Sequence, residues 1–237
     1  MIAHLLRFLL PWACAGCRTP LSSLEDDGFC GRCWLAIARI QGHICRTCGL
    51  PLPDGGSSCY GCRRRPPKIV VRAATVYQGI LPPALHRFKY RGRKSLARSF
   101  GLLLRAAWER FPELQHIQGI VPVPLHPKNE RIRGYNQAEL LAHELSREIS
   151  RPVISLLVRT RQTRSQIQLT RPYRQANMHN AFALHPLALK KQEVLRKGSF
   201  LLMDDVCTTA STLEACARAL RGAGIRNVHA LVLARDL

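Results

Sequence analysis

Eight of the ten cysteines stand in four CxxC pairs between residues 14 and 62. The pairs are Cys14/Cys17, Cys30/Cys33, Cys45/Cys48 and Cys59/Cys62. Two CxxC turns separated by about a dozen residues can place four thiolates around one zinc ion. Because four thiolates leave no open coordination position, we expect two structural zinc sites here and no catalytic metal.

The four pairs can be shared between two metal ions in more than one way. We expect the sequential assignment, in which the first two pairs hold one zinc ion and the last two hold the other. An interleaved cross-brace is the alternative, and an iron–sulfur cluster would use the same ligands. A disulfide scaffold would imply a secreted protein.

The first ten residues, Met1 to Leu10, are apolar but lack the small-residue cleavage site of a secretory signal. They are also too few to span a bilayer. We expect a short amphipathic helix that covers the cysteine module, with peripheral membrane contact as the alternative.

Near the C-terminus, two carboxylates and a run of hydroxyl groups follow an apolar segment. Ser199 to Met203 is too short for a helix and predicts a buried strand. The hydroxyl groups open the next helix, and the free N–H groups of a helix N-terminus suit a phosphate. Adjacent carboxylates are costly to hold together unless hydroxyl donors or a cation engage them, and a sugar diol provides such donors. The expected binding residues are Asp204, Asp205, Thr208, Thr209, Ala210, Ser211 and Thr212. An ordinary capped helix start is the alternative.

From Lys68 onward, expected strands and helices alternate. Strands are expected at 69–77, 120–124, 152–156, 199–203 and 228–234, and helices at 82–90, 94–110, 136–149 and 211–221. The alternation predicts an α/β fold with a parallel sheet that is covered on both faces. Arg63 to Pro67 breaks the pattern, so we expect a double zinc-binding module over 1–67 and a larger domain over 68–237.

The chain is strongly basic, with 36 lysines and arginines against 15 acidic residues and a formal net charge of +21. Such a charge favours a polyanionic partner, with nucleic acid first, an anionic membrane second and small phosphorylated ligands third. His86 to Lys94 interleaves Phe88 and Tyr90 with cations, which suits single-stranded bases and phosphates; core packing is the alternative for both rings. We therefore expect the chain to contact single-stranded DNA.

Residues 204–212 resemble the phosphoribosyl-pyrophosphate loop of type I phosphoribosyltransferases. The resemblance implies that Asp204 and Asp205 bind the ribose 2′- and 3′-hydroxyls, and that residues 208–212 wrap the 5′-phosphate. That family usually has glycine where this chain has Ala210. If φ is positive there, alanine costs about 1 kcal/mol relative to glycine.

The resemblance also implicates the segment after Val121-Pro-Val-Pro in binding pyrophosphate. The residues concerned are Leu125, His126, Arg131 and Arg133, and a solvated basic loop is the alternative for the two arginines. Residues 159–174, with five arginines and no acid, fall where those enzymes carry a mobile hood over the substrate. Positive charge in a hood would stabilise a pyrophosphate leaving group.

The combined motifs are similar to the ComF family of competence and DNA-utilisation proteins over nearly the whole chain. They are the four CxxC pairs, Val121-Pro-Val-Pro-Leu125, Arg133-Gly-Tyr-Asn-Gln137, the region of Gln166 and Asn177, and the Asp-Asp loop. The resemblance implies a cytoplasmic protein that binds phosphoribosyl pyrophosphate (PRPP) with Mg²⁺, or ribose 5-phosphate. It would act beside the DNA-uptake machinery in natural transformation. One alternative is an active phosphoribosyltransferase with an unidentified nucleophile, and another is a zinc-ribbon adaptor with an inactive transferase domain.

Overall fold

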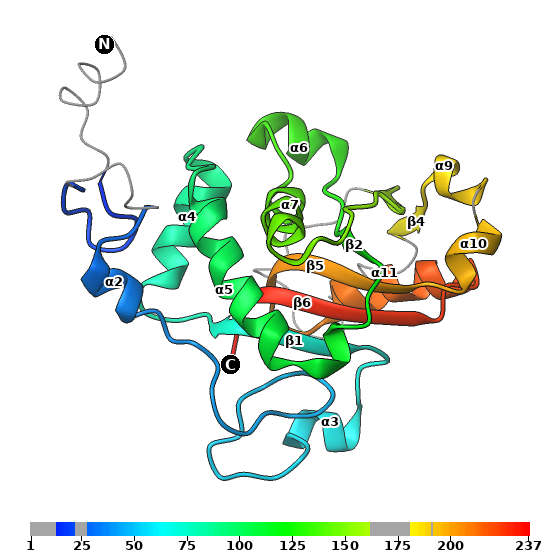
Figure 1. The fold of residues 1–237 in the computed structure, drawn as a ribbon, viewed down its shortest axis with the longest axis horizontal. Helices are drawn as coiled ribbons and strands as arrows, with labels where there is room; N and C mark the ends of the chain where they lie inside the picture. Colours follow the sequence, from blue (N-terminus) through cyan, green and yellow to red (C-terminus); the bar gives the residue numbers. More distant parts are fainter. Residues whose placement is uncertain (1–12, 22–27, 162–180, 191) are drawn as a thin grey trace.

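In the computed structural model, residues 13–21, 28–161, 181–190 and 192–237 are described (Figure 1). The expected helix over Met1 to Leu10 lies outside these residues. Within them, no helix is long and apolar enough to cross a membrane.

A four-stranded parallel sheet forms the centre of the molecule, with strand order β1-β6-β5-β2. The strands are β1 (Val70–Val76), β2 (Gly119–Pro122), β5 (Ser199–Cys207) and β6 (Asn227–Arg235). This confirms the expected parallel sheet. β5 runs four residues beyond the expected end at Met203, because Asp204 and Cys207 still pair in register with β6. The two carboxylates therefore belong to the carboxyl end of a central strand.

Helices cover both faces of the sheet, as expected. The longer helices are α4 (Leu81–Tyr90), α5 (Leu96–Arg110), α7 (Gln137–Ile149) and α11 (Ser211–Gly222). The shorter ones are α2 (Gly31–Leu35), α3 (Tyr60–Arg64), η1 (Pro112–Leu114), α6 (Pro127–Arg133), α9 (Pro186–Leu189) and α10 (Gln192–Arg196). A small antiparallel pair, β3 (Leu157–Arg159) and β4 (Phe182–Leu184), lies outside the main sheet.

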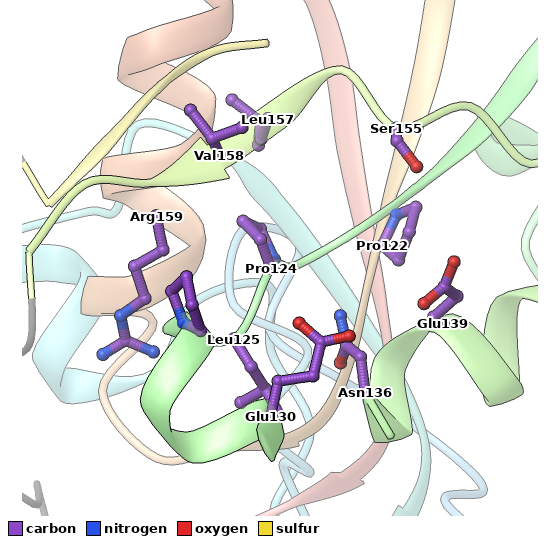
Figure 2. A pocket seen from close by; sticks show the side chains of 11 residues that line it. Pro122, Pro124, Leu125, Glu130, Asn136, Glu139, Ser155, Leu157, Val158 and Arg159 are labelled. Carbon is purple, nitrogen blue, oxygen red and sulfur yellow. The ribbon is translucent and has the colours of Figure 1, made fainter. Parts of the chain in front are cut away.

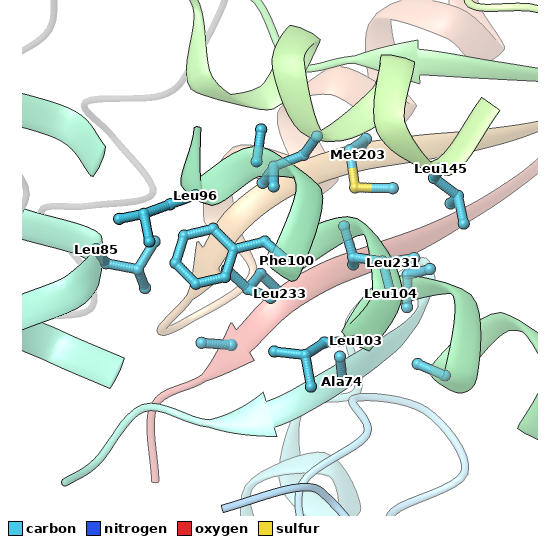
Figure 3. Close-up of a cluster of buried hydrophobic side chains, with 14 of the residues drawn as sticks. Ala74, Leu85, Leu96, Phe100, Leu103, Leu104, Leu145, Met203, Leu231 and Leu233 are labelled. Atoms are coloured by element: carbon cyan, nitrogen blue, oxygen red, sulfur yellow. The ribbon is translucent and has the colours of Figure 1, made fainter. Parts of the chain in front are cut away.

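Side chains of alternate strand residues enter two separate cores. Leu201 and Met203 of β5 pack with α4, α5 and α7, together with Leu231 and Leu233 of β6 (Figure 3). The residues between them, such as Leu202, point to the opposite face and pack with α11. This period-two alternation on a strand buried on both sides is typical of a doubly covered parallel sheet.

Several parts of the expected pattern differ from the structure. The strand expected at 120–124 ends at Pro122, and β3 and β4 were not expected. Residues 152–156 do not form a named strand, and only Val153 makes a parallel bridge, to Ile120. The helix α6 was not expected, although its boundaries carry local signals: Pro127 occupies the first turn, and Gly134 ends the helix with φ of +78°.

The cysteine-rich segment packs against the edge of the sheet. Residues 38–40 run antiparallel to β1, where Ile40 N donates to Ala74 O at 3.0 Å and Val76 N donates to Ala38 O at 2.8 Å. Phe29 also packs against Phe100 of α5, with ring centroids 6.0 Å apart. Figure 1 shows α2 beside α4 and α3 beyond β1, so the two halves of this segment contact different parts of the larger domain.

Candidate functional site

The eight paired cysteines form two separate clusters in the sequential order. Cys14, Cys17, Cys30 and Cys33 make the first site, and Cys45, Cys48, Cys59 and Cys62 make the second site. The sulfurs of each site lie within 4.8 Å of one another. A tetrahedral zinc ion with Zn–S bonds of about 2.3 Å requires sulfurs about 3.8 Å apart. The Sγ atoms of Cys17 and Cys30 are 3.8 Å apart, and those of Cys48 and Cys59 are 3.7 Å apart. Both donor sets therefore fit structural zinc.

Backbone N–H groups point at the sulfurs, as in a metal-binding knuckle. Cys30 N donates to Cys14 Sγ at 3.3 Å, and Cys62 N donates to Cys59 Sγ at 3.4 Å. Burial raises the pKa of the Cys45 thiol, but the N–H groups around it outweigh burial and lower its pKa to about 6. Gly49 has φ of +69°, and a Cβ there would lie 2.6 Å from Val71 O, so this knuckle requires glycine against β1.

The acid pair lies at the carboxyl edge of the sheet, where open α/β sheets bind ligands. Asp205 is only 4% exposed, and one of its oxygens is 2.8 Å from Lys89 Nζ on α4. Burial by itself lowers the pKa of Lys89, but Asp205 and Asp204 reverse this effect, and the pKa is raised. Local periodicity gave no signal for this pair, because it joins two elements that are far apart in the chain.

Asp204 has no cation of its own within salt-bridge distance among the described residues. Its Oδ1 accepts a hydrogen bond of 2.8 Å from Asp205 N. Burial, followed by the charge of Asp205, raises the pKa of Asp204 to about 7. Lys89 and Arg159 act in the opposite direction but do not cancel the increase. At neutral pH this carboxyl group is therefore poised between its charged and neutral forms.

The loop after β5, residues 208–212, leads directly into α11. Ala210 precedes the helix with φ of +62°, the left-handed region expected to favour glycine. Thr209 Oγ1 and Ser211 Oγ lie 2.9 Å apart, so the two hydroxyls share a hydrogen bond. Arg235 Nη1 donates to Cys207 O at 3.2 Å and to Thr208 O at 2.8 Å. We refer to residues 208–212 as the phosphate loop.

A cavity of about 260 Å³ lies at the end of β2 (Figure 2). Its lining combines apolar walls with polar groups: Pro122, Pro124, Leu125, Pro127, Glu130, Asn136, Glu139, Ser155, Leu157, Val158 and Arg159. Burial lowers the pKa of Arg159, and the charge of Asp204 partly offsets this effect, so Arg159 lies within electrostatic range of the acid pair. Figure 2 shows the Glu130 and Glu139 carboxylates on the same side of this cavity.

The four residues expected to face pyrophosphate have different surroundings. Leu125 lines the cavity. His126 caps α6, where its Nδ1 accepts from Lys128 N at 3.3 Å, and Arg131 is exposed. Arg133 turns toward α4: its guanidinium lies 4.9 Å from the centre of the Tyr90 ring and donates to Gln137 Oε1. Their roles toward pyrophosphate stay predictions. Residues 162–180, which include most of the expected hood together with Gln166 and Asn177, lie outside the described residues.

The expected aromatic and basic stretch divides between core and surface. Phe88 is fully buried, so its alternative role in the core is the one that the structure supports. Tyr90 is 58% exposed, and its ring lies 5.1 Å from that of His86. With Arg133 on its face and the exposed Arg91 next to it in the chain, Tyr90 forms a cationic aromatic surface. We call His86, Tyr90, Arg91 and Arg133 the Tyr90 surface.

Comparison with known proteins finds similarity along almost the entire chain. Residues 5–63 match the family described as a double zinc ribbon domain, and residues 136–237 match the phosphoribosyl transferase domain. Competence protein F of Haemophilus influenzae is 33% identical over 230 residues, which cover 94% of this chain and 96% of that protein. DNA utilization protein YhgH of Escherichia coli K12 is 34% identical over 96% of this chain and 99% of its own length. Competence protein ComFC of Bacillus subtilis is 27% identical over 82% of this chain and 78% of its own length.

The positive φ of Ala210 leads to a prediction about stability. A left-handed conformation costs alanine roughly 1–2 kcal/mol, whereas its buried methyl group contributes about 0.8 kcal/mol. Ala210→Gly should therefore leave the free energy of unfolding unchanged or raise it by up to about 1 kcal/mol, and should preserve affinity for inorganic phosphate. Urea denaturation of the zinc-loaded chain measures the free energy of unfolding, and calorimetry measures the affinity for phosphate.

Ala215→Gly, in the interior of α11, is the matched control for Ala210→Gly. It should lower the free energy of unfolding by about 1 kcal/mol, because glycine is disfavoured within a helix. Equal destabilisation by the two substitutions would show that the loop does not carry the expected strain.

Proposed function

Because the chain belongs to the ComF family of competence and DNA-utilisation proteins, we propose that it binds a phosphoribosyl ligand during the uptake or use of DNA. The ligand would be PRPP or ribose 5-phosphate. The observation that carries this proposal is the acid pair at the end of β5. Lys89 lies 2.8 Å from Asp205, whereas Asp204 forms no ion pair among the described residues, so the pair can still accept from hydrogen-bond donors. The two hydroxyls of a ribose would supply those donors. The reduced cysteines that zinc requires fit the cytoplasm.

The phosphate loop supports the same ligand. Helix α11 begins beside the hydroxyls of Thr209 and Ser211, and the dipole at a helix N-terminus favours a phosphate. In PRPP, the pyrophosphate would extend toward the basic residues of the segment after β2, His126 and Arg131. Mg²⁺ would accompany that pyrophosphate, since this ion prefers carboxylate and phosphate oxygens. Within the acid pair, Asp204 is the carboxylate that could approach it, because Lys89 already pairs with Asp205.

The ionisation of Asp204 predicts how affinity for ribose 5-phosphate depends on pH. The carboxylate form accepts hydrogen bonds from the diol, and with a pKa of about 7 this form is scarce at pH 6 and dominant at pH 8. Affinity should therefore rise up to about tenfold between these values. Asp204→Asn should weaken binding roughly 10- to 100-fold, since a hydrogen bond to a charged group is lost, and should remove this part of the pH dependence. Calorimetry on the zinc-loaded chain measures both.

The ligand itself also titrates, because a phosphate has a second pKa near 6. The pH dependence that remains in the Asp204→Asn variant measures the contribution of the ligand phosphate. Asp54→Asn changes an exposed carboxylate in the cysteine module and should leave affinity unchanged. Unaltered affinity in Asp204→Asn with a normal thermal melt would refute a ribose role for this residue.

For the DNA partner, we propose that the Tyr90 surface contacts single strands. An exposed ring can stack on any base, and the surrounding cations attract the backbone. The net charge of +21 supports binding that weakens steeply with salt, through the release of condensed counterions. We expect little sequence preference, because neither stacking on a ring nor attraction to the backbone reads the edges of the bases. The DNA-uptake machinery is the proposed setting for this contact.

Tyr90→Ala should weaken binding of a single-stranded oligonucleotide by about 1–3 kcal/mol, the usual contribution of one stacked base. Its salt dependence should stay the same, because no phosphate contact is removed. Tyr90→Phe is the matched control and should bind as the unaltered chain does. Fluorescence titrations at several salt concentrations, with single-stranded and duplex oligonucleotides in parallel, make the measurement. Equal loss for duplex, or a flat salt response, would defeat the proposal.

A second candidate function is transfer of the ribosyl group, and the cavity in Figure 2 favours it. The cavity combines flat proline walls with Glu130 and Glu139, neither of which forms an ion pair within the described part of the chain. An acceptor ring with N–H groups would fit such a lining. In the reaction, a bond would form between the acceptor nitrogen and ribose C1 while the C1–O bond to pyrophosphate breaks. The acceptor proton would pass to a glutamate.

This candidate predicts release of pyrophosphate from PRPP that depends on an added nucleobase or amine. Glu139→Gln should reduce the turnover at least tenfold while PRPP binding is retained, because the carboxylate acts only on the acceptor. A coupled pyrophosphate assay with a panel of acceptors makes the measurement. Tight PRPP binding without turnover by any acceptor would leave ligand binding as the function of the site.

A further inference from the structure

The second cysteine site lies against the phosphate loop. Both line one cavity of about 360 Å³: Cys48, Cys59 and Cys62 on one side, and Thr208, Thr209 and Ala210 on the other. Arg235, the last residue of β6, lines the same cavity. No residue of the first cysteine site does so. A part of the chain far from the phosphate loop in sequence is thus placed directly beside it.

Arg235 forms hydrogen bonds with the start of the phosphate loop from within this cavity. Its side chain is only 8% exposed, and its Nη1 donates to Cys207 O at 3.2 Å and to Thr208 O at 2.8 Å, with Cys207 Sγ 2.8 Å away. The two carbonyls belong to the last residue of β5 and the first residue of the phosphate loop. Holding both therefore sets the direction in which the loop leaves the strand.

The buried guanidinium has no carboxylate partner among the ion pairs of the described residues, and its buried Nε has no hydrogen-bond partner there. A buried charge is costly unless an opposite charge lies close. A zinc ion with four thiolates carries roughly two negative charges. Arg235 lines the same cavity as Cys48, Cys59 and Cys62, so a metal-loaded second site would place a counter-charge beside the guanidinium.

The second site cannot move far from this position while it is intact. Thr47 O accepts a hydrogen bond of 2.8 Å from Val71 N, and Arg46 O accepts one of 3.0 Å from Arg72 Nη2. Gly49 lies directly on the backbone of β1. The knuckle that carries Cys45 and Cys48 is therefore fastened to the same sheet whose carboxyl edge forms the candidate ligand site.

We propose that Arg235 is a positioning residue that couples the second cysteine site to the phosphate loop. Zinc at that site holds the guanidinium, and the guanidinium holds the Cys207 and Thr208 carbonyls so that the loop N–H groups face a phosphate. This inference rests on the proposed binding of a phosphoribosyl ligand. Because coupling between two sites is reciprocal, zinc strengthens phosphate binding and bound phosphate strengthens zinc binding by the same factor.

The test measures zinc transfer from the full-length, zinc-loaded chain to a chromogenic chelator, with and without saturating ribose 5-phosphate. At equilibrium with the chelator, one of the two zinc equivalents is expected to be held at least about fivefold more tightly when ligand is bound, the lower end of typical coupling. That equivalent should be the one lost in Cys62→Ser and retained in Cys17→Ser. Protection of both equivalents alike, or of neither, overturns the coupling.

Substitution of Arg235 separates positioning from simple packing. In Arg235→Gln, ribose 5-phosphate is expected to bind about tenfold more weakly and no longer to protect the second zinc ion. Arg235→Lys keeps the charge but can reach fewer carbonyls, so it should restore part of the protection. Arg226→Gln, an exposed arginine just before β6, should behave as the unaltered chain. If Arg235→Gln fails to fold, Arg235→Lys and the unaltered chain still carry the test.

The outcomes distinguish this inference from the proposed function. If ribose 5-phosphate binds but neither zinc release nor Arg235→Gln affinity responds, the coupling is wrong and the proposed function stands. If ribose 5-phosphate does not bind but inorganic phosphate binds and protects the second zinc ion, the coupling stands and the ribose assignment is wrong. If neither ligand binds, both fall.

Discussion

The ion pair between Lys89 and Asp205 is the contact on which the arrangement of the candidate site depends. Two adjacent carboxylates at the end of a buried strand would be strongly unfavourable without an opposite charge. Helix α4 supplies one lysine, at 2.8 Å from Asp205, and one only. The result is an asymmetric pair, in which Asp205 is neutralised and Asp204 keeps a raised pKa. Asp204 is therefore the carboxylate of the pair to which the hydroxyls of the proposed ribose would donate.

The two cysteine sites support this arrangement from different sides. The first packs against α4, the helix that carries Lys89, and Arg87 and Arg93 near its end donate to the carbonyls of Ala15 and Ala13. The second lies behind the phosphate loop, where Arg235 stands between the two. A segment this small has little core of its own and takes much of its folding free energy from metal. Under the proposed coupling, metal at the second site would also support the candidate site.

Helix α4 also connects the acid pair to the Tyr90 surface. Consecutive residues on an α-helix point about 100° apart, so Lys89 can face Asp205 while Tyr90 beside it stays exposed. One helix can therefore present a lysine to the buried acid pair and an aromatic, cationic surface to the solvent. The proposed ligand and the proposed DNA contact would share one helix, which brings them close without making them compete for the same side chains.

The spacing of the cysteines was sufficient to predict two four-cysteine sites, because that feature is local. The strand–acid–hydroxyl order of residues 199–212 is equally local, and it was sufficient to predict a strand that leads through two carboxylates to a helix. Strand β1 and helix α7 fall within about one residue of the expected ranges, since their apolar periodicity is strong. The hydrogen-bond ladder with β6, which periodicity does not report, decided that β5 continues through Asp204 and Asp205. Only tertiary structure paired Lys89 with Asp205, buried Phe88, turned Arg133 onto Tyr90 and placed Arg235 between the second cysteine site and the loop. These contacts follow from the strand order β1-β6-β5-β2, which joins segments far apart in the chain, and no local pattern of residues carries that information.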